Sequence, residues 1–299
     1  MKTGLKSIDF LDKKMTHILS VLILNRNNSD DVLRIYEDLM SQSFQDFHLI
    51  VIDDNSSEND LKKLLNVEDE RFLVYSFPAP WKFGIDNKWN MGLRKANQTG
   101  SKYTYTIQTD MKINSHDLLK ELVAHMERDP ECGAACPTIY DKNGVMTWGP
   151  GIEKVRMGKS YNINETFITR NKAMEEMNYV NEKLVFYGHE FYFNNWLKLH
   201  GYNTTPLSGV SITHYAGGTS SKYQSHKDYY RPRTTILIMK LFCKEESLYK
   251  KIIYFYEEIS EIRGKARHYA KQLRLIDLLK LLTLLAFGTF AGLIIRVNE

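Results

Sequence analysis

The order of secondary-structure signals between residues 17 and 110 most constrains the fold of this chain. Four segments of strand length are rich in apolar, aromatic and β-branched residues, and stretches with helical spacing separate them. The predicted strands are 17–24, 47–52, 71–75 and 103–109. Strands that alternate with helices in this way are typical of a parallel sheet with right-handed crossovers. The sequence therefore predicts an α/β fold with a mostly parallel sheet and flanking helices.

Acidic residues follow two of these predicted strands. Asp53 and Asp54 end the second strand, and Asp110 ends the fourth, before a helix expected to start near Ser115. In open α/β sheets, ligands bind beyond the carboxyl ends of the strands. A carboxylate there can accept hydrogen bonds from a base or a ribose, or hold a divalent cation that faces a phosphate. The alternative is that these acids form turns and helix caps.

Composition excludes several classes of protein. Of the 299 residues, 43% are apolar and 25% are charged, as in a globular protein, and the net charge of +4 is too small to indicate nucleic-acid binding. The three cysteines form no paired framework, which fits a reducing compartment. We expect no metal at Cys132 and Cys136, because no partner stands at zinc-like spacing. Residues 1–16 are polar and predict a loose arm without a signal peptide.

Four motifs follow one another in the first half of the chain: SVLILNR, DFHLIVIDDNSSEND, GIDNKWNMGLRKA and IQTDMKI. In order and spacing they resemble the first half of family 2 inverting glycosyltransferases, which have the GT-A fold. The resemblance extends over residues 17–240 and implies a Rossmann-like sheet in an enzyme that transfers a sugar from a nucleotide diphosphate to a hydroxyl group. It also implies Mn²⁺ or Mg²⁺ as the cofactor.

The resemblance assigns roles to individual residues. The implied nucleotide- and donor-binding residues are Asn25, Asp53, Asp54, Arg71, Asn90, Gly92, Gln108, Arg231 and Arg233. Asp110 takes the last position of the family's Asp-x-Asp motif, whose aspartate reaches the metal ion. The first position is Gln108 instead of aspartate, so one carboxylate of the pattern is missing. Phosphates and waters supply most ligands of such an ion, so few protein ligands are needed.

The second half contains matching motifs. The segment Tyr187-Gly188-His189-Glu190 resembles the family's Glu-Asp motif and places Glu190 at the position of the general base. Inverting transfer is a single in-line displacement, so one carboxylate must take the proton of the acceptor hydroxyl. The alternative is a purely structural role, with Glu190 as a solvated acid at the start of a helix and His189 as a packed core residue.

His214, before Ala216-Gly217-Gly218-Thr219-Ser220-Ser221, resembles the family's His-x-x-Gly-x-Ser, whose histidine completes the metal site in several members. A structural role at the end of a strand is the alternative. Residues 229–233, YYRPR, are similar to the Tyr-Tyr-x-x-Arg-Asn segment of the rhamnosyltransferase-like branch. Arg231 or Arg233 would neutralise the leaving diphosphate, unless both are solvated loop residues.

Residues 241–299 predict a helical, basic and amphipathic tail. Its apolar segment 281–295 has 15 residues, fewer than the roughly 20 that span a bilayer. Basic residues interleaved with aromatic ones favour an interfacial helix on anionic lipid. We therefore expect a cytoplasmic protein held peripherally on the membrane face, with a lipid-linked saccharide as acceptor. A tail that packs on the core or forms a homodimer is the alternative.

The expected substrates are a UDP- or dTDP-linked sugar and a saccharide of a surface polysaccharide or glycolipid. Two other classes of function stay open at this point. A catalytically degenerate GT-A scaffold at the membrane is favoured by Gln108 and by Trp196, which stands where the family has arginine. A nucleotidyltransferase would carry a glycine-rich loop after the first strand, and residues 25–31 contain no glycine.

Overall fold

The structure is a computed structural model of the chain, and it describes residues 17–77, 85–164, 166–185, 188–215, 224–260, 264, 266–268 and 275–294. The predicted arm at 1–16, the small-residue segment 216–221 and part of the basic tail lie outside the described residues.

Strands and helices alternate through the first half of the chain, as the sequence predicts. The strands are β1 Leu19–Asn25, β2 Phe47–Asp53, β3 Phe72–Ser76, β4 Tyr103–Thr106, β5 Met111–Ile113, β6 Cys132–Asp141, β7 Met146–Trp148, β8 Lys154–Arg156, β9 Lys159–Tyr161, β10 Phe167–Arg170 and β11 Asn203–His214. The helices are α1 Ser29–Met40, α2 Glu58–Leu65, α3 Asp86–Thr99, α4 Leu118–Arg128, α5 Asn171–Glu176, α6 His189–Leu199, α7 Gln224–Phe242, α8 Leu248–Glu258 and α10 Leu275–Ile294.

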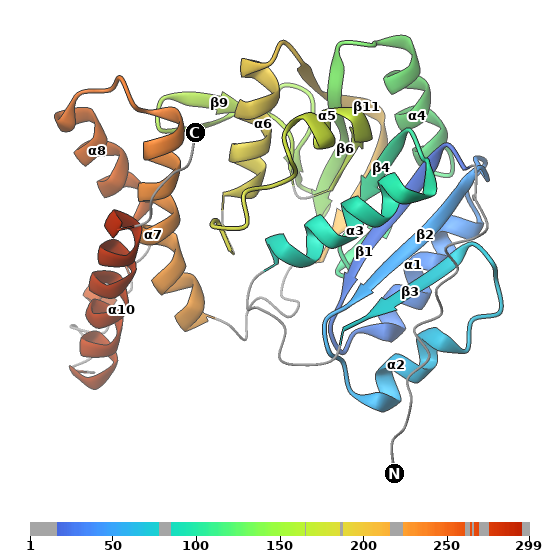
Figure 1. Cartoon of the computed structure of the whole chain (residues 1–299), viewed down its shortest axis with the longest axis horizontal. Helices are drawn as coiled ribbons and strands as arrows, with labels where there is room; N and C mark the ends of the chain where they lie inside the picture. Colours follow the sequence, from blue (N-terminus) through green and yellow to red (C-terminus); the bar gives the residue numbers. More distant parts are fainter. Residues whose placement is uncertain are drawn as a thin grey trace.

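One mixed sheet organises the molecule (Figure 1). Its strand order is β3-β2-β1-β4-β10-β6-β11-β5, and β7 pairs with β6 outside this path. The first four strands are parallel, β10 is antiparallel to both of its neighbours, and β11 runs parallel to β6. This confirms the α/β GT-A architecture, with a mostly parallel sheet and flanking helices. The carboxyl ends of β1 to β4 consequently meet along one edge.

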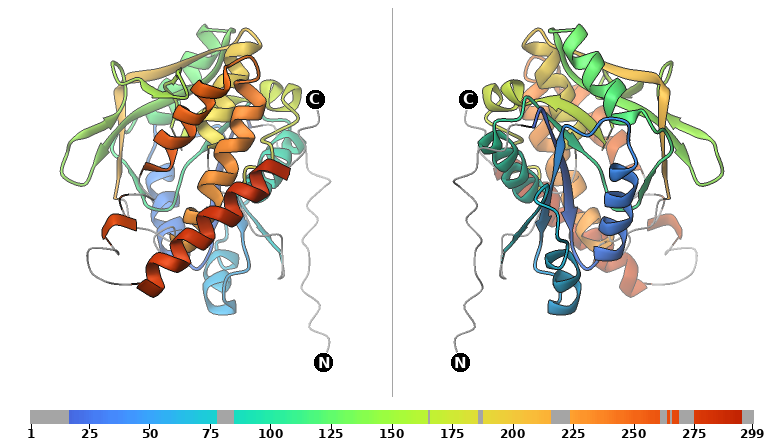
Figure 2. Two further views of the ribbon diagram at one scale, coloured as in Figure 1. Left: turned by 90° about the vertical axis from the view of Figure 1, so that its left-hand side faces the viewer. Right: turned by 90° about the vertical axis from the view of Figure 1, so that its right-hand side faces the viewer.

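Helices cover both faces of the sheet. Figure 2 shows α3 and α1 on opposite sides of the parallel strands. Strands β1 and β2 are buried along nearly their whole length, because a sheet covered on both faces needs continuous apolar runs. Gly92 lets α3 approach β1 closely, since a Cβ atom there would lie 2.3 Å from Cδ1 of Leu22.

The segment after β4 differs from the prediction. β4 ends at Thr106 instead of Thr109, because its pairing with β1 stops at Leu22, and a further strand, β5, forms between Asp110 and the expected start of the helix. The helix begins only at Leu118, with Asp117 at its N-cap. The Oγ of Ser115, the predicted cap, instead accepts a hydrogen bond from the backbone N of Ser211 at 2.9 Å. β11 draws this segment into the sheet by pairing with β5.

Helices α7, α8 and α10 stand together beside the sheet, and α10 crosses α7 (Figures 1 and 2). The two helices are very close at Gly292, where a Cβ atom would meet the backbone O of Arg233 at 2.8 Å. Lys240 Nζ donates to the carbonyls of Gly292 and Leu293 at 3.0 and 2.7 Å. The predicted domain boundary at 240 therefore falls inside α7, which ends at Phe242.

Helix α10 is longer than the apolar segment that the sequence analysis considered. Residues Ile276–Ile294 form 19 helical residues of mean hydropathy 1.7, of which 17% are buried. By length and composition alone, this helix is able to cross a membrane. The helix is longer than predicted because it continues upstream through Asp277 and Lys280, where the prediction ended the apolar segment.

Candidate active site

Three polar side chains form a row at the carboxyl edge of β1, β2 and β3. Asn25, Asp53 and Ser76 are register partners across these strands. Asn25 Nδ2 donates to Asp53 Oδ1 at 2.8 Å, and Ser76 Oγ donates to Oδ2 at 3.2 Å. Ser56 donates to the same carboxylate through Oγ at 2.6 Å and through its backbone N at 3.2 Å. Asp53 is fully buried and its four acceptor positions are occupied, so it holds the turn together.

The next residue, Asp54, turns toward the outside of this edge. Its side chain is 21% exposed and lies between two cations, with Lys88 Nζ at 3.1 Å and Arg26 Nη1 at 3.2 Å. Lys88 comes from the first turn of α3, and its side chain is only 8% exposed. Of the two predicted acids, Asp54 is therefore the one positioned to meet a ligand.

Asp110 and His214 meet at the same edge. His214 Nε2 lies 3.2 Å from Asp110 Oδ2, and the side chains are 26% and 24% exposed. The pairing of β5 with β11 and a hydrogen bond from Tyr215 N to Asp110 O at 2.9 Å bring them together. Gln108 stands in the same turn, where its carbonyl accepts from Met111 N at 3.2 Å.

A half-exposed carboxylate next to an imidazole fits Mn²⁺ or Mg²⁺, provided that phosphate and water oxygens complete the coordination. Asp110 and His214 are the two residues that would hold the ion. The first position of the Asp-x-Asp pattern contributes no carboxylate, as the sequence states.

Glu190 is the second residue of α6 and belongs to a buried acid–base cluster. His189 Nε2 lies 3.1 Å from Glu190 Oε1, and His189 Nδ1 lies 3.4 Å from Oδ1 of Asp86. Asp86 is the first residue of α3 and is fully buried. The Trp89 ring stands edge-on to the His189 ring at 5.4 Å, while its Nε1 donates to Thr106 Oγ1 at 3.1 Å. Trp89 therefore links the end of β4 to this cluster.

Burial and neighbouring charges shift the pKa values of Asp86 and Glu190 in opposite directions. Burial raises the pKa of Asp86 to about 7, with the charges of Glu190 and Glu182 adding to the increase and that of His189 opposing it. Burial alone would also raise the pKa of Glu190. The charge and the hydrogen bond of His189, together with the charge of Arg156, outweigh burial and lower that pKa. Glu190 is therefore ionised at neutral pH, as a general base must be.

Helix α7 and the turn before α6 fix the position of Glu190. Gly188 has φ +80°, and a Cβ atom there would lie 2.5 Å from Ile238 Cδ1 and 2.8 Å from Arg156 Nη1. Only glycine suits both the left-handed backbone and this close approach. Thr234 Oγ1 of α7 donates to Leu184 O at 2.9 Å, just before the turn. The first helix of the C-terminal region is thus part of the site.

Comparison with known proteins decides the family. Residues 20–189, more than half of the chain, match the model of glycosyl transferase family 2. The chain belongs to glycosyl transferase family 2. The match includes Asp53, Asp54 and Asp110 and ends one residue before Glu190.

Solved structures agree with the GT-A fold. S. aureus TarS is similar with a TM-score of 0.59 and 17% identity, over 84% of this chain and 43% of that protein. The chain thus spans less than half of the length of TarS. A TarS 1–349 fragment in complex with UDP-GlcNAc matches with a TM-score of 0.55 and 17% identity, over 90% of both chains. The mannosyltransferase PcManGT from Pyrobaculum calidifontis, in complex with GDP-Man and Mn²⁺, has a TM-score of 0.56 and 10% identity, over 93% of this chain and 86% of that one.

Three residues that the family resemblance assigns to the donor lie elsewhere. Arg71 stands at the amino end of β3, at the opposite edge of the sheet, where Nη2 pairs with Asp69 at 3.0 Å. The prediction assigned Arg71 to the donor, but Arg71 directly precedes β3 and therefore lies at the end of the sheet away from Asp53 and Ser76. Asn90 is buried and holds Val180 through two hydrogen bonds, of 2.7 and 2.9 Å. Gly92 faces the sheet, so neither of these α3 residues reaches the edge.

Arg231 and Arg233 lie on different sides of helix α7. Arg233 Nη1 donates to Lys183 O at 2.5 Å, and burial lowers the pKa of its guanidinium. Arg231 is two residues away and therefore points about 200° around the helix axis. Both arginines lie in a helix and are partly buried, so neither is the solvated loop residue of the alternative, and contact of one of them with a leaving diphosphate stays a prediction.

The first turn of α3 contains candidate site residues that the sequence patterns did not single out. Asp86, Lys88 and Trp89 occupy positions of GIDNKWN that are buried although two of them are charged. The signal was present in the sequence: a helix that starts at the carboxyl edge of a parallel sheet presents its first turn to the ligand. Arg156 of β8 also belongs to the site, because its charge acts on Glu190, and no pattern in the surrounding sequence indicated this.

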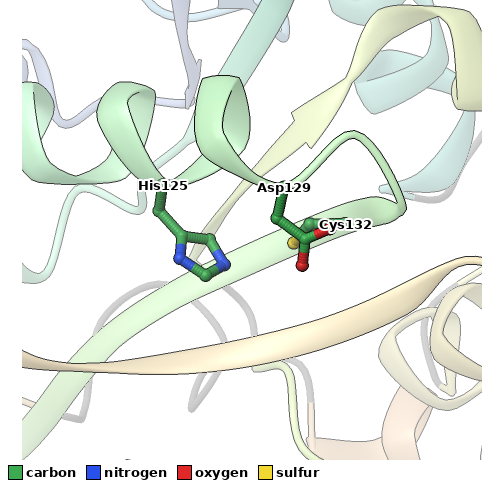
Figure 3. A group of neighbouring side chains, drawn as sticks. All are labelled: His125, Asp129 and Cys132. Atoms are coloured by element: carbon green, nitrogen blue, oxygen red, sulfur yellow. The ribbon is translucent and has the colours of Figure 1, made fainter.

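A second group of side chains with potential metal ligands lies at the other edge of the sheet (Figure 3). Ligand atoms of His125, Asp129 and Cys132 lie within 4.8 Å of one another, although these residues do not stand at zinc-like spacing in the sequence. The end of α4 folds back onto β6 and brings them together. Asp129 already accepts from Asn203 Nδ2 at 3.0 Å, and the Cys132 thiol donates to Ala134 O at 3.2 Å. Burial raises the pKa of that thiol to about 11, so the group is a hydrogen-bonded turn.

Proposed function

We propose that this chain is a metal-dependent inverting glycosyltransferase that moves a hexosyl or deoxyhexosyl group from a UDP- or dTDP-linked donor to a saccharide hydroxyl. The observation that carries the proposal is the arrangement along one sheet edge. Asp54 offers a carboxylate for the nucleotide, Asp110 with His214 offers an ion site, and Glu190 offers a base. Trp89 connects the end of β4, at Thr106, to the base through His189.

The chemistry follows from these positions. Glu190 takes the proton as the O–H bond of the acceptor breaks, a new C–O bond forms at the anomeric carbon, and the C–O bond to the diphosphate breaks on the opposite face. A bound divalent ion would supply positive charge to the departing diphosphate. Asp54 would accept the imide N–H of a pyrimidine or a ribose hydroxyl.

The neighbours support a nucleotide-sugar donor without naming it. TarS fragments were solved with UDP and with UDP-GlcNAc, and PcManGT with GDP-Man and Mn²⁺. We favour a pyrimidine nucleotide because of the carboxylate at Asp54, and the rhamnosyltransferase-like branch because of residues 229–233. The proposed role is assembly of a surface polysaccharide or glycolipid.

Nucleotide binding tests this function. We expect UDP or dTDP, but not ADP or CMP, to stabilise the protein by about 2.7 kcal/mol at a hundredfold excess over Kd, and Mn²⁺ to strengthen the effect. Asp110→Ala should remove the Mn²⁺-dependent part, since it deletes the carboxylate of the ion site. Thermal shift measures both.

The matched control is Asp46→Ala, an exposed aspartate paired with His17 away from this edge. Equal Mn²⁺ dependence in Asp110→Ala would remove Asp110 from the ion site. No response to any nucleotide would contradict the transferase and favour the scaffold alternative.

We also propose that the C-terminal helices bind the cytoplasmic face of the membrane peripherally, beside a lipid-linked acceptor. Large apolar side chains on α10 are 47–71% exposed; they are Ile276, Leu279, Leu282, Phe287, Phe290, Leu293 and Ile294. Helix α8 adds Leu248, Tyr249, Ile252 and Tyr256. The other side of α10 packs on α7 and is bonded through Lys240, so a spanning α10 would have to leave this contact.

Vesicle binding tests the membrane proposal. We expect the double variant Leu279→Glu/Phe290→Glu to reduce co-sedimentation with phosphatidylserine vesicles at least about tenfold. Each change removes apolar area that the membrane would bury, and it adds repulsion from anionic lipid. Val145→Glu, at an equally exposed valine of the β6–β7 hairpin, is the control. If the wild-type protein does not co-sediment with vesicles, and its apparent mass in light scattering doubles as the protein concentration rises, the tail instead forms a homodimer.

A further inference from the structure

We propose that Asp86 is a positioning residue that holds His189 with its Nε2–H directed at Glu190, so that the base stays ionised and aimed. This inference rests on the proposed role of Glu190 in transfer. Asp86 begins α3 and His189 begins α6, so two elements far apart in the sequence meet in this contact.

The geometry limits the protonation states of the cluster. Each ring nitrogen of His189 faces a carboxylate, at 3.4 Å for Nδ1 to Asp86 and 3.1 Å for Nε2 to Glu190. A histidine can donate from both nitrogens only as the imidazolium; in the neutral ring one nitrogen must accept. With Glu190 ionised, as its lowered pKa indicates, either His189 carries a proton on both nitrogens, or the proton lies on the Asp86 carboxyl, 3.4 Å from Nδ1, instead of on Nδ1. Both states leave Nε2–H for Glu190.

Burial makes the second state accessible. Asp86 is fully buried, and burial raises its pKa to about 7, so its carboxyl can hold the shared proton near neutral pH. Glu190, 19% exposed, is then the more acidic of the two carboxyls and the one open to an acceptor hydroxyl. An orienting acid behind a histidine is a recurring way to fix one tautomer.

The surrounding charges come from several elements. Glu182 of the loop after α5 and Glu190 of α6 act on Asp86, and Arg233 of α7 lies within range of its charge. Arg156 of β8 acts on Glu190 and is itself bound to Glu258 of α8 at 2.7 Å.

The Trp89 ring packs against the imidazole and limits its rotation, which leaves Asp86 to decide the tautomer. Asparagine at 86 either accepts from or donates to Nδ1 and therefore no longer enforces Nε2–H.

The decisive experiment compares the pH dependence of kcat in wild type, Asp86→Asn and His189→Gln. We expect Asp86→Asn to lower kcat at least about tenfold with little change in KM, and to move the acidic limb of the profile upward by about one pH unit. Gln at 189 retains an N–H donor toward Glu190 and should keep more activity than His189→Ala. Glu176→Gln, which removes a carboxylate that is bonded to Tyr202 and does not belong to the cluster, is the control and should leave the limb in place.

Two readouts do not depend on activity. In NMR, the His189 ring should titrate at lower pH in Asp86→Asn than in wild type. In urea, the unfolding midpoint of wild type should fall as pH rises through about 7, because folding disfavours ionised Asp86, whereas that of Asp86→Asn should stay level.

A lower kcat with an unmoved acidic limb and an unmoved ring titration would overturn the proposal and leave Asp86 a packing residue. A protein without transfer activity would contradict the proposed function, while the ring titration would still decide the contact between Asp86 and His189.

Discussion

Replacing Glu190 with glutamine is expected to lower kcat of sugar transfer by about 10³-fold while the Kd of the nucleotide stays within twofold. Glutamine keeps the size of the side chain and still accepts from His189 Nε2 at the 3.1 Å contact, but it cannot take a proton. Steady-state kinetics with a donor and acceptor pair, together with calorimetry for the nucleotide, would measure the two effects separately.

Glu176→Gln is the matched control, because Glu176 is a partly exposed acid that accepts from Tyr202 at 2.7 Å away from the site. Transfer by Glu190→Gln within a few-fold of wild type would exclude Glu190 as the base. A parallel loss of nucleotide affinity would instead indicate that the α6 turn had shifted.

The second large effect concerns Asp53, and it should appear in stability instead of nucleotide affinity. We expect Asp53→Ala to lower the free energy of unfolding by about 4 kcal/mol, because it leaves the buried donor of Asn25 and the partly buried donors of Ser56 and Ser76 without this acceptor. Urea unfolding measures the loss. Asp54→Ala should cost less than about 1 kcal/mol, since this carboxylate is partly exposed.

The two variants together separate structure from binding. Asp54→Ala should weaken UDP binding, whereas Asp53→Asn, if folded, should bind UDP nearly as wild type does. If Asp53→Ala remains as stable as wild type and loses nucleotide affinity, the assignment of both acids to the nucleotide stands as the sequence analysis made it.

The sequence by itself determined the architecture of the first half. Continuous apolar runs such as 17–24 predict strands that are covered on both faces, and their alternation with helical spacing predicts parallel pairing. The strand boundaries were least reliable where pairing ends, as at Thr106, because a strand stops where its neighbour stops and not where its own β propensity stops.

The sequence also placed Asp53, Asp54 and Asp110 at one edge, because residues that end parallel strands share that edge, and the family resemblance placed His214 with Asp110. It could not predict which of Asp53 and Asp54 has a structural role and which is accessible to a ligand. Asp53 and Asp54 are adjacent and identical in chemistry, and only the donors of the neighbouring strands decide that Asp53 is buried while Asp54 faces outward.

Tertiary structure alone decided the surroundings of Glu190. Asp86 and His189 are 103 positions apart in the numbering, and no local pattern predicts that a carboxylate at the start of one helix will lie against a histidine at the start of another. The same holds for Gly188, whose need for glycine arises from the approach of Ile238 in α7. Local chemistry specifies which elements form and which end of the sheet carries polar groups, whereas the acidity of a side chain depends on the burial and the charges that packing brings to it.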